Sequence, residues 1–343
     1  MATTATKAVR IGVIGAGRIG SMHADLLARQ VQGAVVSAIQ DVDEDTARSV
    51  AARLGVATAS TVQDVLGAGD VDAVAICSPT GTHADLIVEA ARAGKAIFCE
   101  KPVSLDLGQV DRALAAVEDA GVPFQIGFNR RFDPAHAAVA AAVADGTIGE
   151  PQIVRISSRD PAPPPIAYLR DSGGIFLDMT IHDFDMARFV TGSDVVEVYA
   201  RGAVQLDPAV EAVGDVDTAV VTLTHQSGCL TAIDNSRQAV YGFDQRVEVF
   251  GSAGMAASEN PLAHSAIVRT QDGMRASTLP YFYLERYIPS YLREWEAFVA
   301  AVSEGRTPPV TGTDARAPLV IGLAAWKSLR EGRPVRVEEL ESR

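Results

Sequence analysis

The pattern of hydrophobic and polar positions divides the chain into two halves. In the first half, short continuous apolar runs alternate with amphipathic stretches, whereas in the second half short runs of alternating apolar and polar residues follow one another. Continuous runs are typical of strands buried on both faces of a parallel sheet. Alternating runs indicate strands with one covered face, which usually pair antiparallel. The sequence therefore predicts an α/β protein, with an N-terminal Rossmann doubly wound parallel sheet and a C-terminal α+β domain built on a large open, mainly antiparallel sheet.

The chain of 343 residues is long enough for two domains, which we expect at residues 1–124 and 125–343. The predicted strands are residues 9–14, 34–39, 71–77, 95–99 and 122–127 in the first half, and 152–158, 195–204, 216–224, 229–234 and 246–250 in the second. Two helices are predicted near the C-terminus, at 287–302 and 313–330. The first carries core aromatic residues, and the last is expected to pack back on the first domain.

Composition and charge exclude several classes of function. The formal net charge of −13 leaves no basic stripe for nucleic acid, and it disfavours an anionic membrane surface. The N-terminus has no apolar core typical of a signal peptide, and no apolar run is long enough to cross a bilayer. Three widely spaced cysteines, Cys77, Cys99 and Cys229, fit reduced thiols and give no zinc-binding spacing. We therefore expect a cytoplasmic protein that binds neither nucleic acid nor membrane.

A glycine-rich turn stands between the first predicted strand and a predicted helix at residues 19–29. In this context Gly15 permits the tight turn, Gly17 lets the backbone approach a pyrophosphate, and Gly20 lets helix and strand pack closely. The free N–H groups and the dipole of the helix N-terminus favour phosphate. The predicted dinucleotide-binding residues of this turn are Gly15, Ala16, Gly17, Arg18, Ile19 and Gly20.

An acidic residue, Asp41, follows the second predicted strand about 21 residues after Gly20. This is near the spacing at which a carboxylate binds the ribose 2′-hydroxyl of NAD, and its charge would repel the 2′-phosphate of NADP. The pattern predicts NAD as the cofactor. The alternative is a solvated acid, or a cap for a helix at residues 43–54.

The tripeptide Glu100-Lys101-Pro102 follows the strand at residues 95–99. Proline fixes its own φ and restricts the residue before it, so Lys101 is expected to project from a rigid turn. A lysine ammonium near a nicotinamide ring can lose its charge and then take a proton from an alcohol. Lys101 is therefore a candidate general base.

Asp178 and His182 are four residues apart in a predicted helix of the second half, hence on one face, and Asp185 extends that face. A carboxylate beside an imidazole can orient the ring and select its tautomer. One alternative is an ordinary amphipathic helix. The other is a metal site that also uses Asp183, but no further histidine or cysteine supports it, so no metal is expected.

The glycine turn, Glu-Lys-Pro and Asp-x-x-x-His together resemble the glucose–fructose oxidoreductase/inositol dehydrogenase superfamily over about residues 9–336. The resemblance implies hydride transfer to NAD, with Lys101 as base and with His182, steadied by Asp178, passing the proton on. It also implies a homotetramer through paired C-terminal sheets. Further cofactor contacts that it implies are Ser78, Pro79, Thr80, Glu100 and Lys101. His83 can reach the cofactor, or can equally cap or pack the helix at residues 82–93.

Residues 127–133, 174–189 and 235–246 resemble the inositol dehydrogenase branch of that superfamily, which implies a small polyol substrate and oxidation of myo-inositol to 2-keto-myo-inositol (scyllo-inosose). A cyclic polyol needs several convergent polar side chains. The substrate-binding candidates are Lys101, Arg130, Arg131, Ser158, Asp160, Asp178, His182 and Tyr241. Some relatives have histidine and asparagine near the positions of Ser158 and Asp160, which leaves the isomer open. The alternatives are a scyllo-inositol, other inositol or hexose dehydrogenase and, in another class, a non-catalytic NAD(H)-binding regulator.

Overall fold

The computed structural model of the chain describes residues 8–341, which divide into two compact units. The first unit holds the chain up to Asn129 together with Tyr291–Ala317, and the second holds Arg130–Ser290 and the chain from Pro318 on. The boundary predicted after residue 124 falls inside strand β6 (Phe124–Gly127). Because β6 pairs in parallel with β5 (Ala96–Glu100), the strand belongs to the first sheet, and the boundary follows it.

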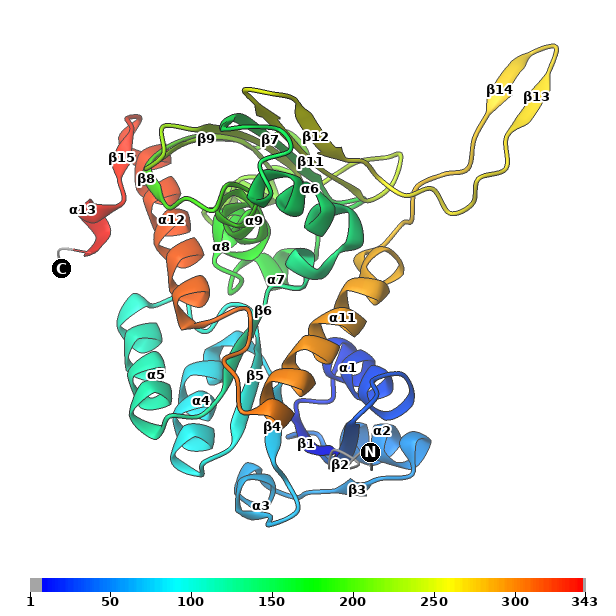
Figure 1. Cartoon of the computed structure of the whole chain (residues 1–343), viewed down its shortest axis with the longest axis vertical. Helices are drawn as coiled ribbons and strands as arrows, with labels where there is room; N and C mark the ends of the chain where they lie inside the picture. The colour runs from blue at the N-terminus through cyan, green and yellow to red at the C-terminus, as the bar shows by residue number, and fades with distance from the viewer. Residues whose placement is uncertain (1–7, 342–343) are drawn as a thin grey trace. The chain divides into compact units, whose positions relative to one another are not determined.

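The first unit is a doubly wound parallel sheet with the strand order β3-β2-β1-β4-β5-β6 (Figure 1). Its other strands are β1 (Val9–Ile14), β2 (Ala34–Gln40), β3 (Ala57–Thr58) and β4 (Ala73–Ile76). Its helices include α1 (Arg18–Arg29), α2 (Glu44–Leu54), α3 (Val62–Gly67), α4 (His83–Arg92) and α5 (Leu107–Ala120). The chain reverses its direction of winding between β1 and β4, and doubly wound sheets bind ligands beyond the carboxyl ends of the strands at such a point.

Helix α1 turns a different face to the core from the one predicted. The sequence pattern put Ile19 and Met22 on its apolar side with two leucines, but both residues are only half-buried. The residues of α1 that are buried are Gly20, His23, Ala24, Leu26 and Leu27. A histidine therefore lies on the buried face.

The second unit contains a seven-stranded sheet with the order β12-β11-β7-β10-β9-β8-β15. Its strands are β7 (Pro151–Arg159), β8 (Val195–Ala203), β9 (Thr218–His225), β10 (Leu230–Ser236), β11 (Asp244–Gly251), β12 (Met255–Ser258) and β15 (Val335–Arg336). Neighbouring strands run antiparallel except β7 and β10, which are parallel. The predicted mainly antiparallel sheet is thus confirmed, with one parallel pair.

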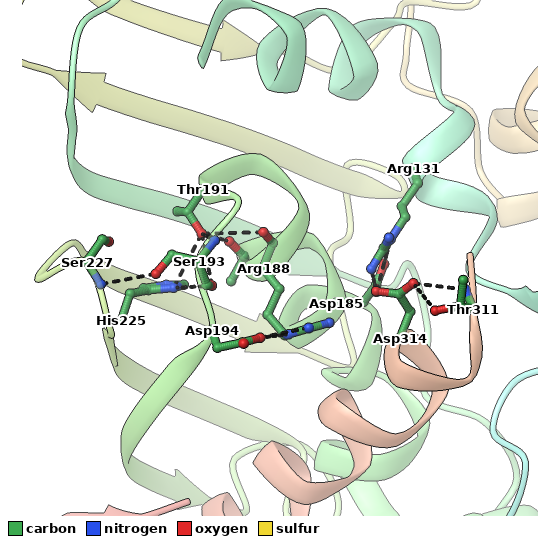
Figure 2. Close-up of polar contacts among 11 residues, drawn as sticks. Arg131, Asp185, Arg188, Thr191, Ser193, Asp194, His225, Ser227, Thr311 and Asp314 are labelled. Carbon is green, nitrogen blue, oxygen red and sulfur yellow. Dashed lines mark hydrogen bonds and ion pairs between the residues drawn. The ribbon is translucent and has the colours of Figure 1, made fainter. Parts of the chain in front are cut away.

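Helices cover one face of this sheet (Figure 1). Those that contribute to the core on this face are α6 (Pro134–Ala144), α8 (Gly174–Asp178), α9 (Ile181–Thr191) and the later part of α12 (Gly312–Glu331). The unit also contains α7 (Ile166–Leu169), α10 (Ala209–Ala212), the hairpin β13 (Val268–Thr270) and β14 (Gly273–Arg275), and α13 (Glu338–Glu341). At the end of α9 the ring of His225 contacts Thr191 and the Ser193 carbonyl, and Arg188 pairs with Asp194 (Figure 2). These contacts fix the end of α9 on the sheet.

The other face of the seven-stranded sheet carries a lateral row of exposed apolar side chains, on four adjacent strands. Met255 is opposite Phe250, Phe250 is opposite Ile153, and Ile153 is opposite Leu230. Each of the four is between 42% and 54% exposed. Four large apolar residues side by side on one exposed sheet face form an apolar patch, and such patches are typical of protein interaction surfaces.

The two long C-terminal helices extend close to their predicted bounds. Helix α11 spans Tyr283–Glu304, with Trp295 and Phe298 fully buried as core residues, as predicted. Its part from Tyr291 on belongs to the first unit, whereas α12 (Gly312–Glu331) belongs to the second from Pro318 on. The part of α11 from Tyr291 on and the start of α12, Gly312–Ala317, thus belong to the first unit. Packing of the rest of the last long helix on that unit stays a prediction. None of the helices within residues 8–341 has the length and apolar content needed to cross a membrane.

Candidate active site

The glycine turn between β1 and α1 packs directly against the segment after β4. Gly15 has a φ of +92°, and a Cβ atom there would lie 2.5 Å from the Ser78 amide nitrogen. A Cβ atom on Gly20 would overlap the carbonyl oxygen of Gly15. At Gly17, by contrast, a Cβ atom would meet no atom of the described residues within 4 Å, and the N-cap of α1 is this glycine. The turn therefore fits a pyrophosphate, because the backbone at Gly17 is open to close approach at the N-terminus of α1.

Asp41 is fixed against this turn. One of its carboxylate oxygens accepts a hydrogen bond from the Ala16 amide at 2.6 Å, and the other accepts one from the Asp43 amide at 2.9 Å. The N-cap of α2 is Asp43, whose own carboxylate accepts from the Asp45 amide. The capping alternative for Asp41 is therefore wrong. Its contact with the ribose stays a prediction.

His83 packs inside the first unit. Its ring is 1% exposed, with Nδ1 2.8 Å from the Pro102 carbonyl oxygen and Nε2 2.7 Å from the Ser78 carbonyl oxygen. Burial lowers the pKa of His83, and a neutral ring donates one N–H to one of these carbonyls at a time. The structure favours the packing alternative for His83, which connects the Ser78–Thr82 loop to the turn at Lys101-Pro102. Its contact with the cofactor stays a prediction.

Lys101 is half-buried and follows the last residue of β5, Glu100. The Lys101 amide donates to Glu100 Oε2 at 3.3 Å, and Glu100 Oε1 is 2.7 Å from Nε2 of His23. The carboxyl ends of β1, β4 and β5 meet at one edge of the parallel sheet. The structure therefore brings the glycine turn, the loop at Ser78 and Lys101 to the same edge of the first unit, as the sequence predicted.

The predicted Asp178–His182 helix is two helices. Asp178 is the last residue of α8 and His182 lies in the first turn of α9. Thr180 lies at the break, and its hydroxyl is within hydrogen-bond distance of both the Ile175 carbonyl and the Asn235 side chain. The prediction that Asp178 and His182 share a face of one continuous helix is therefore wrong. The orientation of His182 by Asp178 stays a prediction.

Asp178 has two partners that sequence reasoning missed. Tyr168 Oη donates to its carboxylate at 2.8 Å, and Arg237 Nη1 lies 3.4 Å from it. Burial and the neighbouring Asp178 charge raise the pKa of the Tyr168 hydroxyl, so it stays a donor. Arg237 could have been found from the sequence, because it lies within residues 235–246, which carry the family resemblance. No comparable pattern pointed to Tyr168.

Arg130 and Arg131 each pair with a carboxylate of α9. Arg130 Nη1 lies 2.7 Å from Asp183, which also accepts a hydrogen bond from Asn235 at 2.8 Å. Arg131 binds Asp185 with two nitrogens, at distances from 2.6 to 3.1 Å (Figure 2). Burial raises the pKa of Asp183 to about 6, although the positive charge of Arg130 acts to lower it. These pairs give both arginines internal partners, and their contact with substrate stays a prediction.

Asp160 completes a charged cluster at the carboxyl edge of the parallel pair β7 and β10. It follows the end of β7, and Arg237 follows the end of β10, where Arg159 and Ser236 are register partners. Burial raises the pKa of Asp160 to about 6; the charge of Asp178 acts in the same direction, and that of Arg237 opposes it. We call Asp160, Asp178 and Arg237 the polar cluster. Its groups can accept and donate hydrogen bonds to hydroxyls.

The other two substrate candidates have internal partners. Ser158 is fully buried and donates to Gln245 at 2.8 Å. Tyr241 is half-exposed, donates to Asp244 at 2.6 Å and accepts from Arg159 at 2.9 Å. Their binding of substrate stays a prediction.

Comparisons with known proteins agree with this fold. Residues 9–128 match the model of an oxidoreductase family with an NAD-binding Rossmann fold, and residues 136–257 match the GFO/IDH/MocA C-terminal domain. The myo-inositol 2-dehydrogenase of Thermotoga maritima is 50% identical, over 97% of this chain and 99% of that protein. The inositol 2-dehydrogenase of Rhizobium meliloti is 46% identical, over 96% of this chain and 99% of that protein.

Solved structures give the same result. A probable dehydrogenase from Thermotoga maritima superposes with a TM-score of 0.95 at 49% identity, over 97% of this chain and all of that chain. The scyllo-inositol dehydrogenase of Lactobacillus casei, solved with NAD(H) and scyllo-inositol, gives 0.90 at 29% identity, over 97% of this chain and 100% of that chain. The chain belongs to the GFO/IDH/MocA family of NAD-binding oxidoreductases.

Proposed function

We propose that the chain oxidises myo-inositol at C2 to 2-keto-myo-inositol (scyllo-inosose). The observation that carries the proposal is Lys101, a lysine at the same sheet edge as the dinucleotide-binding glycine turn. The substrate rests on similarity along the whole chain to relatives named for myo-inositol or inositol, at 46–50% identity. A second candidate is scyllo-inositol, because a Bacillus subtilis relative named scyllo-inositol 2-dehydrogenase (NAD(+)) is 37% identical.

Oxidation of a secondary alcohol removes a hydride from carbon and a proton from oxygen. NAD, when bound, supplies the hydride acceptor at C4 of its nicotinamide. We assign proton removal to the neutral amine of Lys101. We assign orientation of the hydroxyl and onward transfer of the proton to His182 with Asp178. These roles rest on the chemistry of the groups and on the family resemblance.

We assign recognition of the ring hydroxyls to the polar cluster. A cyclic polyol presents hydroxyls all round its ring, each of which both donates and accepts hydrogen bonds. The carboxylates of Asp160 and Asp178 accept, and the Arg237 guanidinium, 3.4 Å from Asp178, can donate while it holds that carboxylate in place. Charged partners make such hydrogen bonds stronger than neutral ones. The cluster therefore suits a substrate with several hydroxyls better than an apolar one.

We also propose that the chain assembles as a homotetramer through the open face of the seven-stranded sheet. The apolar row Met255, Phe250, Ile153 and Leu230 supports this, because burial of such a row against a second copy is favourable by roughly 25 cal/mol per Å². Three buried free thiols support a reducing compartment, and we propose the cytoplasm.

The first prediction concerns Lys101. With NAD at alkaline pH, the purified chain is expected to form NADH from myo-inositol faster than from scyllo-inositol, D-chiro-inositol or D-glucose. Lys101→Ala removes the base and should lower kcat by a factor on the order of 10² or more, while NAD binding survives. The initial rate at which NADH absorbance rises measures kcat. Quenching of the protein fluorescence on titration with NAD measures cofactor binding.

The matched control is Lys101→Arg, which keeps the positive charge but cannot lose it. It should bind NAD as the wild type does and turn over as slowly as Lys101→Ala. Wild-type kcat in either variant would contradict the role of Lys101. Activity on none of the four substrates, with NAD still bound, would favour a regulator over an enzyme.

The second prediction concerns Asp41 and cofactor choice. Asp41→Asn removes the charge that repels a 2′-phosphate but keeps an oxygen for the Ala16 amide. The ratio of kcat/KM for NAD to that for NADP should fall by about tenfold or more, which is about 1.4 kcal/mol. Asp43→Asn is the control, since it changes the adjacent cap and not the ribose contact. Equal ratios in Asp41→Asn and the wild type would refute the role of Asp41.

The third prediction concerns assembly. Ile153→Asp places a charge at the centre of the apolar row and should convert the tetramer to smaller species, as measured by sedimentation velocity. Val35→Asp is the control, because Val35 is a strand residue of the first unit with similar exposure, 48% against 42%. A tetramer that persists in Ile153→Asp, or a wild-type monomer, would count against the open face as the interface.

A further inference from the structure

The turn at Lys101 is linked through Glu100 to a buried histidine, His23, that the proposed reaction does not use. His23 lies on the buried face of α1 and is 0% exposed. Its ring makes edge contacts with Phe98, Tyr291 and Trp295, with centroids 5.4 to 5.5 Å apart. A polar side chain enclosed by aromatic rings needs internal hydrogen-bond partners, because water does not reach it.

The partners of His23 determine which ring nitrogen carries hydrogen. Trp295 Nε1 donates to His23 Nδ1 at 2.8 Å. The tryptophan indole can only donate, so Nδ1 must be the acceptor and carries no hydrogen. In that tautomer the hydrogen is on Nε2, which donates to Glu100 Oε1 at 2.7 Å. The hydrogen bonds therefore run in one direction, from Trp295 through His23 to Glu100.

Glu100 transmits this constraint to Lys101. While Oε1 is bound by His23, Oε2 accepts the Lys101 backbone N–H at 3.3 Å. Gly127 of β6 lies beside the same oxygen, because a Cβ atom there would come within 3.3 Å of Glu100 Oε2. The carboxylate is thus confined between the histidine, the Lys101 amide and the neighbouring strand, all within the first unit.

We propose that Trp295 and His23 are positioning residues for Lys101. Trp295 holds the His23 ring in place through Nδ1, His23 holds one oxygen of Glu100, and the other oxygen holds the backbone from which the Lys101 side chain projects. Neither residue touches the substrate or the cofactor in this role. The inference rests on the proposed function of Lys101 as the base, and it adds two residues that act through Glu100.

The decisive variant is Trp295→Phe, which keeps an aromatic ring in the core and removes the N–H. Without that donor, Nδ1 of His23 is a buried acceptor that has lost its indole partner, so the ring is free to shift and its hydrogen bond to Glu100 is no longer held in place. We expect kcat with myo-inositol to fall about tenfold or more, because small misplacement of a reacting group is costly. KM for NAD should stay within about twofold, since the glycine turn is unchanged.

The matched control is Phe298→Leu. Phe298 contacts Trp295 in the same aromatic cluster, with centroids 5.6 Å apart, but its side chain has no hydrogen-bonding group. This variant should lower Tm and leave kcat near the wild-type value. A purely structural role for Trp295 would give the same outcome in Trp295→Phe, a lower Tm with unchanged kcat, and would overturn the proposal.

A double-mutant cycle tests whether Trp295 acts through His23. His23→Phe removes both hydrogen bonds, and adding Trp295→Phe to it should lower kcat no further. Additive losses would contradict the proposal. If His23→Phe does not fold, the nitrogen NMR shifts of histidine in the wild-type protein with NAD decide the tautomer: hydrogen on Nε2 of His23 is expected, and hydrogen on Nδ1 would overturn the inference.

The Lys101 and Trp295 variants together distinguish failure of the positioning role from failure of the proposed function. Full activity of Lys101→Arg would remove the proposed base, whatever Trp295→Phe does. Loss of activity in Lys101→Arg together with wild-type kcat in Trp295→Phe would leave the base in place and overturn only the positioning role.

Discussion

The contact on which the first unit depends is the close packing of the glycine turn against the end of β4. It is possible only because Gly15 and Gly20 lack side chains: a Cβ atom on the first would come 2.5 Å from the Ser78 amide nitrogen, and on the second would overlap the Gly15 carbonyl oxygen. This packing sets the start of α1 beside the loop that leads to His83. From there His83 connects to the Pro102 carbonyl, so the turn that carries Lys101 is held by the same packed edge.

The second unit stabilises charge in its interior, where desolvation is expensive. Asp183 illustrates the balance: burial raises the pKa of its carboxyl group to about 6, while Arg130 at 2.7 Å and Asn235 at 2.8 Å favour the ionised form. Such pairs fix α9 against the sheet. The polar cluster of Asp160, Asp178 and Arg237 uses the same chemistry at the carboxyl edge of β7 and β10. Within this cluster burial raises the pKa of Asp160, and shifted carboxyl groups are frequent at functional sites.

The sequence was informative where the position of a residue depends on its neighbours along the chain. The glycine turn, Asp41 and Glu100-Lys101 were placed at one edge of the sheet because local spacing and strand order determine this; their functional roles stay predictions. The break between α8 and α9 was not predicted, and Thr180 at the break bonds Asn235, a residue distant in sequence. His23 was missed for the same reason: its partner Trp295 lies 272 positions along the chain. Hydrophobic periodicity cannot reveal which distant side chain satisfies a buried polar group.

The proposed reaction moves a hydride from C2 of myo-inositol to NAD. Incubation of the purified protein with NAD and myo-inositol that carries deuterium only at C2 tests this directly, with mass spectrometry of the reduced cofactor and of the keto product. One deuterium is expected in NADH and none in the ketone, with 2-keto-myo-inositol as the product. Unlabelled NADH, with deuterium retained in an oxidised product, would show that another carbon is oxidised and would contradict the proposed reaction.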